Sequence, residues 1–316
     1  MNTVVEGYER PARHPELATF VRATRPPFLI LTVIACFVGF ATSAAQGVPF
    51  QSGYAAATLL LAVLAHAAAN VWNDCSDALL GTDAINVRRI EPYTGGSRVI
   101  QNGELSAADM RRYALALAGA AIAGGLLLAV LRGPGLLAIG LAGGFIGWAY
   151  SQPGLALMSR GLGEFAVGIG WALVVVGADF VQRGHFTDLP FAASVGVALL
   201  VAALLTINQI PDIDADRACG KHTLAVRLGA LATSRVYACF TLGAYVWLGF
   251  AIASARLPSS AALAGLALPI AAAALRGAFR HVGPRGGDLR PALRANVLHV
   301  LAHIALLALG LWRAAP

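Results

Sequence analysis

Charged residues and cysteines are scarce in this chain of 316 residues. Only 12% of the residues are charged, whereas 58% are hydrophobic, and the mean hydropathy is +0.69. The four cysteines lack the paired spacing of a zinc site, so we expect them to be small apolar fillers. Residues 1–20 are polar where a cleavable signal peptide needs an apolar core, so we expect no such peptide. This composition predicts a protein that crosses a membrane several times.

Apolar stretches close to the roughly 20 residues that cross a bilayer recur along the chain. They predict an all-α membrane protein in which a cytoplasmic segment, 1–21, precedes one transmembrane domain, 22–316. We expect nine transmembrane helices, at residues 26–45, 54–77, 112–131, 134–151, 162–182, 190–212, 231–254, 259–279 and 292–313.

Basic residues are distributed unevenly between the two sides of this predicted bundle. Of the 23 lysines and arginines, only Arg132, Arg183, Arg256 and Arg313 fall on the side opposite the N-terminal segment. Positive residues gather on the cytoplasmic side of membrane proteins, so we expect an N-in, C-out protein of the cell's inner (plasma) membrane. The net charge of +7 then reflects membrane orientation and requires no nucleic-acid partner.

An acidic cluster, NVWNDCSDALLGTD, lies at the cytoplasmic end of the second predicted helix, at residues 70–83. Asn70, Asn73, Asp74 and Asp77 are spaced so that their side chains line one face of that helix. Gly81 is expected to end the helix and to let Asp83 fold back toward this face.

A second cluster, INQIPDIDADRACGKHTLAVRLG, occupies residues 207–229 at the end of the sixth predicted helix. Asn208, Asp212 and Asp216 again form a single stripe. Pro211 is expected to break or kink the helix there, and Asp214 to point elsewhere unless the helix has already unwound. Carboxylates beside membrane spans need metal ions or cations to compensate them, because each costs about 2.5–3.5 kcal/mol at a bilayer centre.

Two facing stripes of oxygen ligands suit a hard divalent cation such as Mg²⁺. We therefore expect an active site with catalytic carboxylates at Asp74, Asp77, Asp212 and Asp216. The expected metal ligands are the same four residues together with Asp83.

The motifs NDxxD (Asn73, Asp74, Asp77) and DxxxD (Asp212, Asp216) resemble those of the UbiA superfamily of intramembrane prenyltransferases. Within it the chain is most similar to the menaquinone-pathway branch, 1,4-dihydroxy-2-naphthoate polyprenyltransferase. Four stretches carry this similarity: NDCSDALLGTD (73–83), YTGGSRVIQNGELS (93–106), SRGLGE (159–164) and DIDADRACGKHTLAVRLG (212–229). One departure is Gly81, which stands where many relatives have a third aspartate.

The resemblance implies a bundle of nine helices around a central cavity, capped by two long cytoplasmic loops. It also implies Mg²⁺-dependent transfer of a polyprenyl group from its diphosphate to an aromatic quinone precursor, and we expect the site to hold two Mg²⁺ ions. Six acidic side chains, two Mg²⁺ ions and a diphosphate would leave a net charge of roughly −5, which basic residues must neutralise. The candidates are Arg98, Arg160, Arg217, Lys221, the chain's only lysine, and Arg25. The remaining expected substrate contacts are Asn70, Asn73, Asn208, Tyr150 and His66.

Two other functions remain open from the residues alone. A terpene cyclase would use the same metal site without an aromatic acceptor, but it needs an aromatic cavity and only 8% of this chain is aromatic. An ion-coupled transporter would need carboxylates at the bilayer midplane, whereas these lie toward one face.

Several polar residues have alternative roles. His66 either contacts the acceptor's hydroxyl groups or packs in the bundle, and Tyr150 either shields a cation or anchors the interface. His299 and His303 have the spacing of a metal pair but lack a third ligand, so we expect a structural role. Asp179, near the opposite surface, is expected to be solvated.

Overall fold

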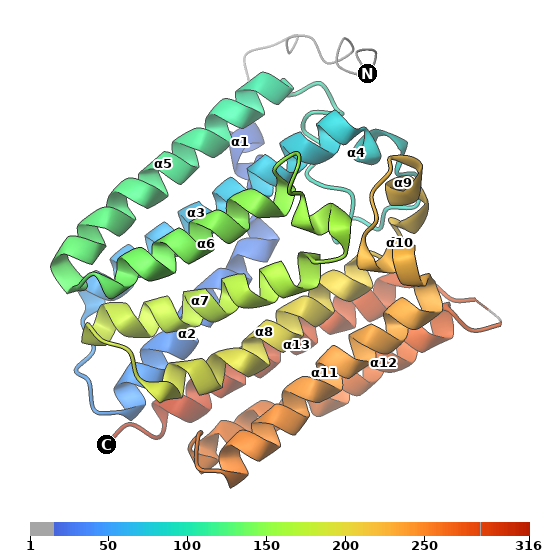
Figure 1. Ribbon diagram of the computed structural model, residues 1–316. Helices are drawn as coiled ribbons and strands as arrows, with labels where there is room; N and C mark the ends of the chain where they lie inside the picture. Colours follow the sequence, from blue (N-terminus) through green and yellow to red (C-terminus); the bar gives the residue numbers. More distant parts are fainter. Residues whose placement is uncertain (1–15, 285) are drawn as a thin grey trace.

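The computed structural model describes residues 16–284 and 286–316, and these residues form helices and connecting loops without a strand. Long helices run side by side in one bundle, and the short helices α4, α9 and α10 gather at one end of it (Figure 1). The predicted N-terminal segment 1–21 lies mostly outside the described residues. The long helices are α2 (Pro26–Ala45), α3 (Ser52–Leu80), α5 (Ala107–Arg132), α6 (Gly135–Ser151), α7 (Gly163–Arg183), α8 (Asp188–Asn208), α11 (Ala230–Ala253), α12 (Leu268–His281) and α13 (Arg290–Trp312). The short ones are α1 (Leu17–Ala23), α4 (Thr82–Ile85), α9 (Ile213–Ala218), α10 (Leu224–Leu228) and the 3₁₀ helices η2 (Leu157–Arg160) and η3 (Ser259–Ala267).

Eight helices among the described residues are long and apolar enough to cross a bilayer, with η3 and α12 joined as one span. The chain is therefore an all-helical, multi-pass membrane protein. Helix α6 is apolar but has only 17 residues, a length of about 25 Å, which is shorter than the hydrocarbon core of a typical bilayer. The count of nine spans stays a prediction because of this helix.

Close contacts between helix backbones hold the bundle together. Gly39 of α2 lies against α7, where an added Cβ would stand 2.3 Å from the carbonyl oxygen of Val175. Gly310 of α13 lies against η3 in the same way, with the carbonyl oxygen of Ser260 at 2.4 Å from such a Cβ. Helices in lipid associate through such small residues, because lipid tails provide no hydrophobic force between them.

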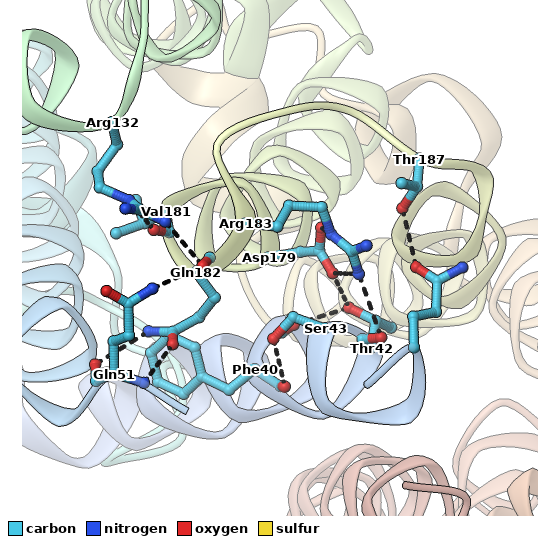
Figure 2. Close-up of polar contacts among 12 residues, drawn as sticks. Phe40, Thr42, Ser43, Gln51, Arg132, Asp179, Val181, Gln182, Arg183 and Thr187 are labelled. Atoms are coloured by element: carbon cyan, nitrogen blue, oxygen red, sulfur yellow. Dashed lines mark hydrogen bonds and ion pairs between the residues drawn. The ribbon is translucent and has the colours of Figure 1, made fainter. Parts of the chain in front are cut away.

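The end of the bundle away from α4 and α9 is closed by a buried polar network (Figure 2). Arg183 Nε donates to Asp179 Oδ2 at 2.6 Å, and the Thr42 hydroxyl of α2 donates to Asp179 Oδ1 at 2.7 Å. The prediction that Asp179 is solvated is wrong, since its side chain is 1% exposed. Its partner Arg183 lies four residues further along α7, so the two charges meet on one helical face.

The histidine pair of α13 is buried between helices and takes part in packing. The Tyr245 hydroxyl of α11 lies 2.8 Å from His299 Nε2, and the Tyr245 ring meets the His303 ring edge to face. Of the cysteines, Cys36 and Cys75 are buried, as expected of apolar fillers, whereas Cys239 is exposed.

Candidate active site

The two acidic clusters meet at one end of the bundle, although they are far apart in the sequence. Helix α3 carries the first cluster to this end, and α8 carries the second, followed by α9 and α10. Helix α4 packs against α9 (Figure 1). The side chains of both clusters therefore face a common space between the two connections.

Gly81 turns the chain back after the first cluster. It caps α3 in the left-handed conformation, with φ of 81°, which confirms the predicted helix end. Asp83 then lies on α4 and is only 4% exposed. A Cβ built on Gly96 would stand 2.6 Å from Asp83 Oδ2 and 3.1 Å from Asp74 Oδ1. Asp83 and Asp74 therefore line the same small space.

The second cluster begins where α8 stops. This helix ends at Asn208, three residues before Pro211, so a break near Pro211 is confirmed. The prediction that Asn208, Asp212 and Asp216 form one helical stripe is wrong, because α9 begins only at Ile213. Asp212 precedes the first turn of α9, and Asn86, in the loop after α4, donates to its Oδ1 at 2.6 Å. Asp214 points away from the buried acids, since it is exposed and pairs with Arg88 at 2.8 Å.

Lys221 joins the two clusters directly. Its ammonium group contacts Asp77 of the first cluster and lies 3.5 Å from Asp216 Oδ1 of the second. All three side chains are largely buried. Burial lowers the pKa of Lys221, but the charges of Asp77 and Asp216 outweigh it and raise the pKa overall. Lys221 therefore stays protonated between the two acids.

Arg25 pairs with the remaining acid of the first helix. It precedes α2 with a φ of 55°, and its guanidinium contacts Asp74 Oδ1. The Ser97 backbone N–H donates to the other oxygen of Asp74 at 2.9 Å. Arg98 instead donates to the backbone carbonyl of Asp83, so it supports the loop carrying this acid. Asp74 is thus held from two sides, by Arg25 before α2 and by Ser97 in the loop after the first cluster.

Burial makes two acids of the site harder to ionise than free aspartate. Burial, with the nearby charge of Asp77, raises the pKa of Asp83 to about 7. Burial also raises the pKa of Asp212 to about 7, although its hydrogen bond from Asn86 opposes the shift. Bound cations would stabilise the ionised form of both.

Several predicted substrate contacts are engaged within the protein. Asn70 donates to the Thr24 carbonyl at 3.0 Å, and Asn73 donates to the Ser151 hydroxyl at 3.3 Å. Arg160 donates to the Gly154 carbonyl at 2.5 Å and is exposed. Arg217 is exposed as well and lies 3.9 Å from Asp214. The structure does not bring these two arginines to the buried acids.

Two predicted contacts lie beneath the acids in the bundle. His66 is one helical turn before Asn70, and its Nδ1 lies 2.7 Å from the Thr32 hydroxyl. Its ring meets the edge of Trp171 with a centroid distance of 4.9 Å. Tyr150, near the end of α6, approaches Gly163, where an added Cβ would lie 3.6 Å from its ring.

The donor set fits a hard cation, because it consists of carboxylate and amide oxygens. Asp83 Oδ2, Asn86 Oδ1 and Asn208 Oδ1 are buried and have no hydrogen-bond partner within the described part of the chain. Among residues 16–284 and 286–316, no three acidic, histidine or cysteine side chains stand close enough to form a ready metal cluster. Arg25 and Lys221 contact three of the acids from which a cluster would be built.

Comparison with known proteins assigns the chain to a family. The model of the UbiA prenyltransferase family matches residues 32–313. The chain belongs to this family. Among its UbiA relatives, the 1,4-dihydroxy-2-naphthoate octaprenyltransferase of Haemophilus influenzae is 31% identical, over 94% of this chain and 96% of the relative. The enzyme of the same name from Escherichia coli is 30% identical, over 93% and 94%.

Solved UbiA structures share the fold. A UbiA homologue from Aeropyrum pernix K1 superposes with a TM-score of 0.70 at 20% identity, over 89% of this chain and 97% of the homologue. A UbiA homologue from Archaeoglobus fulgidus, bound to DMAPP and Mg²⁺, gives 0.63 at 15% identity, over 92% and 99%. The protein is thus a prenyltransferase with the UbiA fold.

Sequence reasoning did not identify two groups that hold the acids of this UbiA prenyltransferase. These are Asn86 on Asp212 and the Ser97 backbone N–H on Asp74. Asn86 has no sequence signal, since a single amide in a loop is common. Gly95 and Gly96 do give a signal, because paired glycines predict a loop with positive φ, and both adopt it.

Proposed function

We propose that this protein transfers a polyprenyl group from its diphosphate to 1,4-dihydroxy-2-naphthoate in menaquinone biosynthesis, with Mg²⁺ at the two acidic clusters. The observation that carries the proposal is the bridge by Lys221 between Asp77 and Asp216, which brings both clusters to one point. The names of relatives about 30% identical over nearly the whole chain support the acceptor. The metal is supported by the A. fulgidus homologue, which is bound to DMAPP and Mg²⁺.

The acids would hold the metal, and the basic residues would hold the diphosphate. Metal ligands would come from Asp74, Asp77, Asp83, Asp212 and Asp216, and two bound Mg²⁺ ions would offset the negative charge that develops on the leaving diphosphate. Lys221, Arg25 and Arg98 surround the same acids and would donate to the diphosphate oxygens.

Bond cleavage transfers an electron pair from the prenyl carbon–oxygen bond to the diphosphate. The allylic cation that remains is attacked by the electron-rich ring of the acceptor. In the naphthoate branch the ring also loses its carboxylate, so no strong base is required at that carbon. His66, held by Thr32, would orient the acceptor, and Tyr150 would face the cation. The prenyl chain would lie inside the bundle, reached from the lipid.

The same proposal includes a membrane orientation. We place the acidic clusters at the cytoplasmic face of the inner membrane, because all but four of the 23 basic residues fall on that side of a nine-span, N-in, C-out topology. Cysteine labelling of Ser259 and of Arg88, each changed to cysteine, tests this topology in intact cells. Labelling of the second position by an impermeant reagent from outside would contradict it.

A direct assay tests the reaction. The detergent-purified protein is given Mg²⁺, a labelled polyprenyl diphosphate and 1,4-dihydroxy-2-naphthoate. A prenylated naphthoquinol and free diphosphate are expected, and neither should form when Mg²⁺ is chelated. A terpene hydrocarbon or alcohol formed without acceptor would indicate a cyclase, and the absence of diphosphate release would favour transport.

A further inference from the structure

The acids of both clusters contact cations of the protein itself. Lys221 contacts Asp77 and Asp216, and Arg25 contacts Asp74. The side chain of Lys221 is 7% exposed, so these contacts are shielded from solvent and the charges interact strongly. Three of the five acids in the proposed metal site are thus compensated without a metal.

A divalent cation alone would have to compete with these contacts. An ammonium group and a Mg²⁺ ion repel each other at close range, so both cannot share the oxygens of Asp77 and Asp216. A metal that binds without an anion would displace Lys221 and leave its charge buried without a partner, which is costly. A metal that arrives with a diphosphate provides the displaced cation with new oxygens.

The basic residues have donors to spare for such an anion. Arg25 Nε and Arg98 Nε are both buried and lack a hydrogen-bond partner among the residues described. Lys221 lies in the loop between α9 and α10, next to Gly220, around which there is open space. Its backbone therefore belongs to a connecting loop and not to a membrane-spanning helix.

We propose that Lys221 and Arg25 hold the acids until a metal and a diphosphate arrive together, and then transfer from the acids to the diphosphate. This inference rests on the proposed function and adds an order to it: the divalent cation binds weakly alone and cooperatively with the diphosphate. The two cations are positioning residues that compete with the metal and then bind its counter-ion.

Metal binding without substrate tests the proposal. Mn²⁺ is titrated calorimetrically into the wild-type protein and into Lys221→Met, first alone and then with inorganic diphosphate. Without diphosphate, Lys221→Met should bind Mn²⁺ roughly tenfold more tightly, because a competing charge is gone. With saturating Mn²⁺, the same variant should bind diphosphate roughly tenfold more weakly, because a phosphate ligand is gone.

Two control variants separate the local contact from net charge. Lys221→Arg keeps the positive charge and should retain the weak binding of Mn²⁺ alone. Arg235→Met removes one positive charge from an exposed arginine of α11 that makes no ion pair within the described chain, and it should leave both affinities unchanged. Weaker or unchanged binding of Mn²⁺ by Lys221→Met would overturn the proposal, because a merely structural lysine would not improve metal binding when removed.

A second variant covers the case in which Lys221→Met does not fold. Arg25→Met frees Asp74 alone. Like Lys221→Met, it should bind Mn²⁺ more tightly without diphosphate and bind diphosphate more weakly with saturating Mn²⁺. The failure of this inference is distinct from failure of the proposed function. Wild-type protein that forms the prenylated product, while neither variant binds Mn²⁺ more tightly, would keep the transferase and reject the exchange.

Discussion

Gly96 is the position where the loop after the first cluster comes closest to the acids, so Gly96→Ala should damage the site directly. The residue has a φ of +70°, and a Cβ there would lie 2.6 Å from Asp83 Oδ2 and 3.1 Å from Arg25 Nη2. Contacts below 3.0 Å are not tolerated, so Asp83 must shift by several tenths of an ångström. A misplacement approaching 1 Å can cost on the order of 100-fold in rate, so we expect a loss of roughly 10- to 100-fold.

A matched control in the same loop, Gly103→Ala, measures the effect of backbone strain alone. Gly103 has a φ of +71°, but a Cβ on it would meet nothing within 4 Å. Both alanine variants should therefore lose about 1–2 kcal/mol of stability from the left-handed conformation. Only Gly96→Ala carries the additional displacement of Asp83.

The assay is the initial rate of prenylated product formation, normalised to folded protein, together with thermal unfolding in detergent. Gly103→Ala should retain nearly wild-type turnover with a lower unfolding temperature. Equal turnover of the two variants would refute the reasoning, because it would mean that the space between Gly96 and Asp83 does not matter for catalysis.

Three further predictions concern the acids of the site, the buried pair of Asp179 and Arg183, and the contact between His66 and the acceptor. Asp74→Asn or Asp212→Asn should abolish turnover while leaving the protein folded, as judged by circular dichroism; retained activity in both would contradict the metal-site assignment. Asp179→Ala removes the partner of a buried guanidinium and should cost about 3–5 kcal/mol of stability, with turnover per folded molecule preserved. His66→Gln should raise the KM for the naphthoate roughly tenfold, as loss of one hydrogen bond to substrate would, without affecting the KM for the prenyl diphosphate. Thr32→Val should act in the same direction but less strongly, since it only frees the His66 ring; an equal rise in both KM values would contradict the assigned role.

The features that sequence predicted well are those set by local physics. The spans follow from hydropathy, because a lipid-facing helix must be apolar along its length. Gly81 ends α3 where expected through its own backbone preference, whereas α8 ends at Asn208, before Pro211 and four residues short of the predicted end at 212. The helical spacing of the aspartates also placed Asp74 and Asp77 toward the shared space.

The features that sequence missed depend on contacts between distant segments. Arg217 lies within the second acidic cluster in sequence and Arg160 in the stretch 159–164, yet both side chains are exposed, because η2 and α9 turn them away from the buried acids. Asn86 and Ser97 contact acids only once the connection after α4 has folded over the site. Asp179 is buried, contrary to the prediction, because Arg183 on the same helix and the Thr42 hydroxyl of α2 bind its carboxylate.

The contacts at position 221 explain why this residue is a lysine and not an arginine. It is the only lysine among 23 basic residues, and among the described residues it alone forms ion pairs with acids of both clusters. A guanidinium group matches the two oxygens of a single carboxylate. Arg183 shows this elsewhere in the chain, since it donates to both oxygens of Asp179. An ammonium group is a compact charge on a flexible stem, so it can be shared between two carboxylates and can leave them. A site that exchanges a cation shared by two carboxylates for a metal and a diphosphate favours lysine at that point, whereas Arg25 pairs with the single carboxylate of Asp74.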